Sequence, residues 1–460
     1  MNTAPTFIDH TESYLPNNYT QLVEIATQYG TPTYIFDEQI LKQNCQRVLA
    51  MPNAFGLTVR YAMKANANRA LLQLITSTGV QIDASSLNEV KRAIAAGIPK
   101  HKIQLTTQEN AIGKKRQELE ELILGGLSYN VCSLSQYEHL RVFAKKNKEH
   151  ITLAVRVHPE KGTGESTTRN TGGKYSCFGV HQENLPELLQ KAKQDGISFH
   201  TVHTHVGSGG DPEVWRANID DQLAIVENHF PEAKCVSFGG GFKVARMPYE
   251  KDADINALGA YAKQKIQDFK ERTGRALHME VEPGTFIAAK AGNVLTQVID
   301  RKKTGEDGID FILVDGSMEV NARPLLYGSK HPFIILKKDG SLISDEFNLD
   351  SSATKDLNER AIVGRCCETG DAQTISETGE IAPRLMGNPK IGDYVLVGAC
   401  GAYSSELSAN NYNSHVAPAM VLLQEDGKVQ LIRKEQKLEA LYANEIDLGD
   451  QLTQQEKGAN

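Results

Sequence analysis

The sequence predicts an α/β fold, a (β/α)8 barrel of the TIM type followed by a mostly antiparallel β domain. The first observation is a series of eight short apolar runs between residues 57 and 284, with helical patterns between them. The second is a change after residue 290 to closely spaced apolar runs bounded by Gly and Asp turn signals. An open, doubly wound parallel sheet is the alternative that the first observation also allows.

The predicted strands share an enrichment in β-branched and other large apolar residues, and helical segments such as KKRQELEELIL (114–124) fill the intervals. The runs assigned to the barrel are LTVRYA (57–62), GVQIDA (79–84), KIQLTT (102–107), LSYNVCS (127–133), TLAVRV (152–157), FHTVHTHV (199–206), CVSFGGG (235–241) and LHMEVEPG (277–284). The runs assigned to the β domain are NVLTQVID (293–300), DFILVDG (310–316), PFIILKKDG (332–340), RAIVGRCC (360–367), DYVLVGA (393–399) and PAMVLLQEDGKVQLI (418–432).

The run TPTYIFDE (31–38) comes before the barrel repeat and decides the expected domain boundaries. Because it has no place in the repeat, we expect residues 1–37 to form an N-terminal segment that pairs with the β domain. We assign residues 38–290 to the barrel and residues 291–460 to the C-terminal β domain.

Composition favours an enzyme that acts on a small molecule. The 460 residues are 40% hydrophobic, and the net charge of −7 comes from interspersed acids and bases, which predicts neither nucleic-acid binding nor membrane binding. No apolar stretch is long enough to span a membrane, and the start of the chain does not resemble a signal peptide, so we expect a cytoplasmic protein. The seven cysteines show no C-x-x-C spacing, which argues against a disulfide framework and against a metal site.

A barrel places its active site at the carboxyl ends of its strands, so residues just beyond each run form one ring in space. In this sequence the ring contains several chemically capable side chains. They are Lys64, Asp83 with Ser85, Ser133, Arg156 with His158, His205 with Ser208, Gly239 to Gly241, and Glu282.

Four of these features together suit pyridoxal phosphate. Lys64 would form a Schiff base with the aldehyde, which requires a neutral amine, and its apolar and amide neighbours in YAMKANAN suggest partial desolvation. The turn Gly239–Gly241, with Ser208, could hold the phosphate. His205 offers a planar ring for stacking, and Glu282 could keep the pyridine nitrogen protonated.

Taken singly, each feature has a plainer interpretation. Three glycines more often make a tight turn than a ligand loop, a lone histidine is more often structural, and a glutamate at a strand end is usually a surface residue.

Seven motifs in order carry a resemblance over residues 30 to about 440: YAMKAN, HTHVGSG, FGGGF with MPYE, EPG, NARPLLYGSKH, CCETGD and GAYSSELSANNYNS. The chain resembles the fold-type III pyridoxal-phosphate decarboxylases, which have an alanine racemase-like barrel. Within that family it is most similar to the members that act on meso-diaminopimelate. The resemblance implies an obligate homodimer with shared active sites and an amino acid as substrate.

The resemblance also implies roles for individual residues. The catalytic residues would be Lys64, His205, Glu282 and Cys367, with Cys367 donating a proton in the partner subunit's site. The cofactor would be held by Lys64, His205, Ser208, Gly239, Gly240, Gly241, Glu282, Gly284 and Tyr403. Substrate contacts would come from Arg323, Tyr327, Glu368 and Tyr403. Without the resemblance, Cys366 and Cys367 would be interpreted as two small buried hydrophobic residues.

Two positions depart from the family pattern. Thr285 stands where the family usually has the arginine of EPGR, and Cys177 stands where it often has a lysine. Both changes remove positive charge near the site, so they favour a different substrate.

The implied function is therefore decarboxylation of an amino acid, with meso-diaminopimelate giving L-lysine as the leading reaction. The main alternative is a related decarboxylase acting on another amino acid in siderophore, polyamine or antibiotic biosynthesis. A racemase is disfavoured because racemases of this fold place an arginine, and not a glutamate such as Glu282, at the pyridine nitrogen. A non-catalytic paralogue is disfavoured by the presence of Lys64, Glu282 and Cys367.

Overall fold

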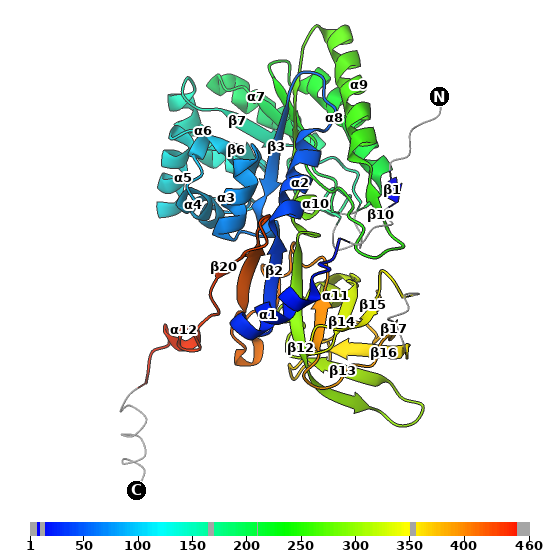
Figure 1. Ribbon diagram of the computed structural model, residues 1–460. Helices are drawn as coiled ribbons and strands as arrows, with labels where there is room; N and C mark the ends of the chain where they lie inside the picture. Colours follow the sequence, from blue (N-terminus) through cyan, green and yellow to red (C-terminus); the bar gives the residue numbers. More distant parts are fainter. Residues whose placement is uncertain (1–6, 10–13, 164–169, 209, 350–355, 449–460) are drawn as a thin grey trace.

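The computed structural model describes residues 7–9, 14–163, 170–208, 210–349 and 356–448. It contains a barrel surrounded by helices and, below it in Figure 1, a second body built from β strands. None of the helices in these ranges is long and apolar enough to cross a membrane.

The barrel consists of eight parallel strands, and all eight predicted runs contribute one. They are β3 (Leu57–Ala62), β4 (Gln81–Ala84), β5 (Ile103–Thr106), β6 (Ser128–Val131), β7 (Leu153–Arg156), β8 (Thr201–His203), β9 (Cys235–Ser237) and β11 (His278–Val281). Neighbours pair in this order, and β11 pairs with β3 to close the ring. The open-sheet alternative is therefore wrong.

Helices form the outer layer of the barrel (Figure 1). They are α2 (Glu38–Leu49), α3 (Arg69–Ser77), α4 (Leu87–Ala95), α5 (Lys114–Leu124), α6 (Leu134–Asn147), α7 (Leu185–Asp195), α8 (Pro212–His229) and α9 (Ile255–Thr273), with the short α10 (Thr285–Ala288) after β11. Several begin at a polar cap just beyond a strand. The side chains of Asn68, Ser86 and Ser133 accept hydrogen bonds from the first turns of α3, α4 and α6. Ser133 is thus a helix cap.

The second body is a mostly antiparallel sheet, as predicted. Its strands run in the order β15 (Leu342–Asp345), β14 (Phe333–Leu336), β18 (Tyr394–Val397), β12 (Gly292–Lys303), β13 (Asp310–Val314), β16 (Asn358–Val363) and β17 (Arg384–Met386). The hairpin β19 (Ala419–Leu423) and β20 (Val429–Arg433) joins it through β2 (Thr33–Asp37). The parallel pairs are β13 with β16 and β2 with β19. The sequence analysis missed β15 and β17.

The remaining elements are short or peripheral. They are β1 (Phe7–Asp9), which pairs with β10 (Lys251–Ala253), and the helices α1 (Tyr19–Tyr29), α11 (Arg323–Tyr327) and α12 (Glu439–Tyr442).

Strand β2 lies between β12 and β19, although it precedes the barrel in sequence. Its side chains alternate between two hydrophobic cores. Tyr34 and Phe36 pack in the core shared with the barrel, whereas Ile35 packs in a smaller core with residues of α1. The last residue of β2, Asp37, accepts a hydrogen bond from the Ile40 amide and so caps the start of α2. One short strand thus connects the two bodies.

Candidate active site

A cavity of about 410 Å³ opens at the carboxyl ends of the barrel strands. Residues from at least six strand ends line it, together with one residue from the β body. The lining residues that bear on chemistry are Lys64, Asp83, Ser85, Arg156, Phe178, His203, His205, Ser208, Gly241, Glu282, Gly284, Thr285 and Tyr403.

Lys64 lies in the single turn η1 (Met63–Ala65) that follows β3, and its side chain is exposed to the cavity. Its neighbours in the chain do not cover the side chain, so its partial desolvation stays a prediction. Tyr61 and Asn66 are buried, but they anchor the backbone instead, because the Tyr61 hydroxyl donates to the Asn66 carbonyl at 3.2 Å. The Asn66 amide also donates to the Gly401 carbonyl at 3.4 Å. These contacts fix the turn that presents Lys64.

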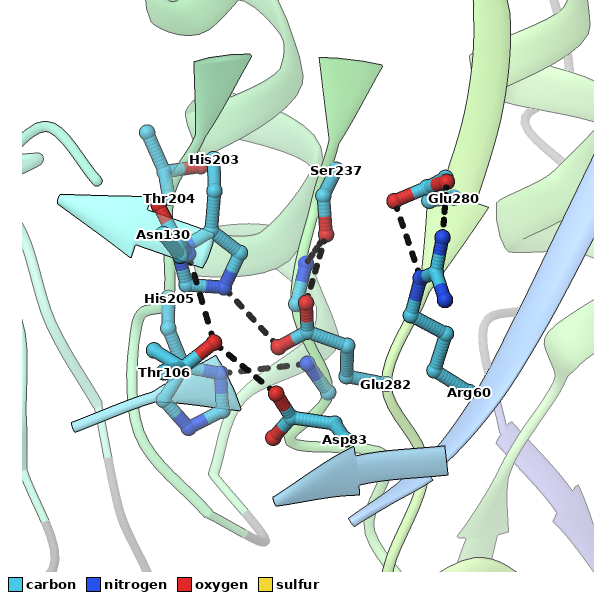
Figure 2. A network of polar contacts seen from close by, with 12 residues as sticks. Arg60, Asp83, Thr106, Asn130, His203, Thr204, His205, Ser237, Glu280 and Glu282 are labelled. Atoms are coloured by element: carbon cyan, nitrogen blue, oxygen red, sulfur yellow. Dashed lines mark hydrogen bonds and ion pairs between the residues drawn. The ribbon is translucent and has the colours of Figure 1, made fainter. Parts of the chain in front are cut away.

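Glu282 follows β11 and is held by three donors from three other strands. Gln104 donates to Oε1 at 2.9 Å, Ser237 donates to Oε1 at 3.0 Å, and His203 donates from Nε2 to Oε2 at 2.9 Å. Figure 2 shows His203 and Ser237 pointing at this carboxylate. Burial by itself raises the pKa of Glu282, but the charge and hydrogen bond of His203 and the hydrogen bond of Ser237 hold the pKa well below its usual range. Glu282 is therefore a carboxylate.

Asp83, at the end of β4, is the second buried carboxyl of the cavity. Its Oδ1 accepts a hydrogen bond from the Thr106 hydroxyl at 2.8 Å. Burial and the nearby Glu282 charge raise the pKa of Asp83 well above its usual value, against the opposing charge of Lys64. The two carboxyls are linked, because the Gln104 amide donates both to Thr106 at 3.3 Å and to Glu282. The site thus keeps one carboxyl charged and favours a proton on the other.

His205 is fixed by the glycine turn that follows β9. The Gly240 amide donates to Nδ1 of His205 at 3.1 Å, which leaves the ring proton on Nε2. Burial, then the charges of Arg156 and Lys64, lower the pKa of His205 well below its usual value. His205 is accordingly a neutral ring with a fixed orientation.

The three predicted glycines differ in what they do. Gly241 lines the cavity, whereas Gly239 and Gly240 pack beneath it. A Cβ atom on Gly240 would lie 2.3 Å from the Glu282 carbonyl oxygen, and one on Gly239 would lie 2.6 Å from Nδ1 of His205. The absence of side chains here lets this turn approach the strand ends closely.

Tyr403 is the contribution of the β body to the cavity. It follows β18, has φ of +59°, and its amide donates to the Ala65 carbonyl at 2.8 Å. Its hydroxyl lies 3.1 Å from where a Cβ on Gly284 would be. Ser208 and Gly284, both expected at the site, line the same cavity.

The other residues expected from the β body do not line this cavity. Cys367 and Glu368 are exposed on the loop after β16, where Asn413 accepts a hydrogen bond from the Cys367 amide at 2.8 Å. Arg323 is fully buried at the start of α11 and lies over the ring of Tyr327. Within one chain, Lys64 therefore does not share its cavity with Arg323, Tyr327, Cys367 or Glu368.

The sequence analysis missed the residues that support Glu282, namely His203, Gln104 and Ser237. A signal for two of them exists. Side chains in a strand alternate between faces, so a polar residue two positions before a site residue also points into the barrel. His203 precedes His205 by two, and Ser237 precedes Gly239 by two.

Comparison with known proteins agrees with this geometry. Residues 41–289, more than half of the chain, match the family model of the pyridoxal-dependent decarboxylase pyridoxal-binding domain. The chain belongs to the family of pyridoxal-dependent decarboxylases.

Its similar relatives include diaminopimelate decarboxylases. The enzyme from Escherichia coli is 29% identical, over 92% of this chain and 96% of its own length. The enzyme from Methanothermobacter thermautotrophicus is 31% identical, over 90% of this chain and 91% of its own. A crystal structure of diaminopimelate decarboxylase superposes with a TM-score of 0.82 at 28% identity, covering 94% of this chain and 98% of that one.

The cavity fits the cofactor of this family, pyridoxal phosphate. Lys64 offers an amine, Glu282 an anionic carboxylate, and His205 a neutral planar ring, all facing one cavity. Gly241 and Ser208 offer an uncrowded backbone and a hydroxyl, which are groups that bind phosphate.

Proposed function

We propose that this enzyme removes one carboxyl group of meso-diaminopimelate as carbon dioxide and releases L-lysine. The observation that carries the proposal is the cavity where Lys64, His205 and Glu282 lie together at the strand ends. The relatives described above support the choice of substrate. L-Lysine differs from diaminopimelate by one carbon dioxide, so the reaction requires no oxidant or reductant.

Lys64, Glu282 and His205 would hold the reacting end of the cofactor and its ring. When bound, pyridoxal phosphate accepts the electron pair that the departing carboxyl group leaves behind. Lys64 supplies the amine for the aldehyde, and Glu282 supplies a carboxylate for the ring nitrogen. His205, held neutral and in a fixed orientation by Gly240, supplies a face for stacking.

The phosphate would be held at the edge of the cavity formed by Ser208, Gly241 and Gly284, with Tyr403 above Gly284. In this assignment Gly239 and Gly240 act by close packing and do not bind the phosphate, since the Gly240 amide already donates to His205. The cavity is also lined by polar residues, among them Ser85 and Gln108, that could bind the far end of a diamino acid.

The proposal includes a homodimer with shared sites. Cys367 and Glu368 are exposed on one loop, so a partner subunit could receive them. Cys367 would donate a proton to the substrate carbon, and Glu368 would pair with the far ammonium group. Tyr327 would contact the substrate from the same body, and the fully buried Arg323 would act through Tyr327, whose ring lies beneath its guanidinium.

Two broader predictions accompany this proposal. We propose that residues 1–37, 38–290 and 291–460 behave as the N-terminal segment, the barrel and the β domain, a division that limited proteolysis would check. We also propose a cytoplasmic location, which cell fractionation would check.

A substrate panel tests the function. Purified enzyme should release carbon dioxide fastest from meso-diaminopimelate when it is compared with the LL and DD isomers, lysine, ornithine, arginine and carboxynorspermidine. A faster reaction with any other member would contradict the proposed substrate.

Thr285 favours one alternative, a decarboxylase with another amino acid as its substrate. This residue lines the cavity at the position where the family usually has an arginine. If the departure weakens recognition of a substrate carboxylate, Thr285→Arg should raise kcat/KM for meso-diaminopimelate relative to the substrate that the native enzyme prefers. An unchanged substrate ranking would show that Thr285 is neutral.

A further inference from the structure

The carboxylate of Glu282 has two oxygens with different hydrogen-bonding capacity. Oε1 already accepts from Gln104 and Ser237, so both of its lone pairs are used. Oε2 accepts from His203, which leaves one acceptor position. Glu282 lines the cavity, so Oε2 is the oxygen able to meet a further donor there.

Burying His203 reduces the stability of the fold in a way that burying a hydrophobic residue would not. Its side chain is 1% exposed, and within the described part of the chain its Nδ1 has no hydrogen-bond partner. An unsatisfied buried nitrogen is destabilising, and a leucine could fill such a position without that penalty. The ring's hydrogen bond goes from Nε2 to Glu282, so the contribution of His203 is made through that carboxylate.

The register of β8 explains how this contact arises. His203 and His205 are two residues apart, and both line the cavity. His205 is bound by the glycine turn, whereas His203 lies beside Glu282, as Figure 2 shows. One strand therefore supplies both rings.

We propose that His203 is a positioning residue for the cofactor. Its Nε2 proton fixes Oε2 of Glu282 in place as a charged acceptor, and Oε2 is the atom that receives the proton-bearing ring nitrogen. The proposal rests on the proposed pairing of Glu282 with that nitrogen. His203 touches neither substrate nor cofactor in this assignment and acts only through Glu282.

The test compares two cofactors that differ at one atom. Pyridoxal phosphate and its 1-deaza analogue, in which a C–H group replaces the ring nitrogen, are titrated into cofactor-free enzyme, and the ratio of their dissociation constants is measured. The native enzyme should prefer pyridoxal phosphate, because the analogue leaves the second acceptor position of Oε2 without a donor. His203→Leu should reduce this preference by about tenfold or more, mainly by weakening binding of pyridoxal phosphate.

Further variants test whether the effect comes from the hydrogen bond that residue 203 donates. His203→Gln keeps an N–H donor and should restore part of the preference. Ser237→Ala should reduce the preference less than His203→Leu does, since Gln104 still serves Oε1. Circular dichroism and thermal melting of the cofactor-free variants identify any that do not fold, and in that event His203→Gln and His203→Asn carry the comparison with the native enzyme.

Glu282→Gln distinguishes failure of the role proposed for His203 from failure of the proposed pairing of Glu282 with the ring nitrogen. If it abolishes the preference while the folded His203 variants keep the native ratio, the role of His203 is refuted and the proposed function stands. If Glu282→Gln also keeps the native ratio, the pairing of Glu282 with the ring nitrogen is refuted.

Discussion

At the scale of single residues, the site holds two carboxyl groups whose surroundings shift their pKa values in opposite directions. Glu282 receives three hydrogen bonds and lies beside the charge of His203, whereas Asp83 receives one hydrogen bond and faces the charge of Glu282. Such a separation lets neighbouring acids take different roles at one pH. The division of roles comes from neighbours and not from residue type.

Asp83 should therefore reduce the stability of the cofactor-free protein near neutral pH. A carboxyl with a raised folded pKa binds protons more tightly in the folded state, so its contribution is lost as pH rises above the unfolded pKa of about 4. We expect Asp83→Asn to raise Tm at pH 7 to 8 by roughly 1 to 3 °C, with the gain disappearing near pH 4.

Asp339→Asn is the matched control for Asp83→Asn. The hydroxyl and amide of Ser341 lower the pKa of this exposed aspartate, so its removal should give no gain in Tm at neutral pH. If Asp83→Asn also gives no gain in Tm at neutral pH, burial of the Asp83 carboxylate does not destabilise the folded protein. Thermal melts over a series of pH values provide the measurement.

Lys64 should be indispensable, because it is the amine in the cavity assigned to the cofactor aldehyde. We expect Lys64→Ala to abolish turnover and to remove the visible absorbance of the covalently bound cofactor. Lys91→Ala removes a lysine that pairs with Glu118 on the surface and should change neither property. Retention of both properties in Lys64→Ala would refute the assignment.

At the scale of elements, short turns at the strand ends decide where the functional groups lie. The turn after β9 places Gly240 against the Glu282 backbone and orients His205, and the turn after β3 presents Lys64. These turns depend on contacts with each other, so a change in one should disturb its neighbours.

Gly240→Ala tests this dependence. The added Cβ would meet the Glu282 carbonyl oxygen at 2.3 Å, a contact with backbone that a side-chain rotation cannot relieve. We expect a loss of about 1 to 3 kcal/mol in the free energy of unfolding and weaker cofactor binding. Gly305→Ala is the control for cofactor binding: at φ of +100° it also strains the backbone and lowers stability, but its Cβ would have nothing within 4 Å, so it should leave cofactor affinity unchanged. Denaturant melts and cofactor titrations distinguish the two variants.

At the scale of the whole molecule, the β body contributes Tyr403 to the cavity of its own chain, and we propose that Cys367 and Glu368 serve the partner's cavity. Tyr403 lines the cavity of its own chain and is tied by its backbone to Ala65. Cys367 and Glu368 are exposed and do not line that cavity, which is compatible with the proposed shared dimer site.

Mixed dimers test the sharing of sites. Lys64→Ala and Cys367→Ala enzymes should each be inactive or nearly so, since a proton donor contributes roughly 10² to 10⁴-fold in rate. A dimer with one chain of each kind should recover one working site of two, because one site keeps both native residues. Activity restored on mixing, measured against each variant alone, would support sharing, and continued inactivity of isolated mixed dimers would contradict it.

Much of this arrangement was predictable because local rules govern it. The alternation of apolar runs and helical segments predicted the barrel, and the carboxyl-end rule brought Lys64, His205 and Glu282 into one cavity. These predictions depend only on the order of elements along the chain, which the sequence states directly.

What the tertiary structure decided concerns contacts between distant residues. The support of Glu282 by Gln104, Ser237 and His203 joins four strands, and no spacing in the chain encodes which side chains meet across a barrel. The exposure of Lys64 was likewise set by packing, because its buried neighbours bond to backbone. The sequence alone determined the fold class and the residues that meet in the cavity, whereas their charges and orientations depended on the folded neighbourhood, since desolvation and hydrogen bonding act only across space.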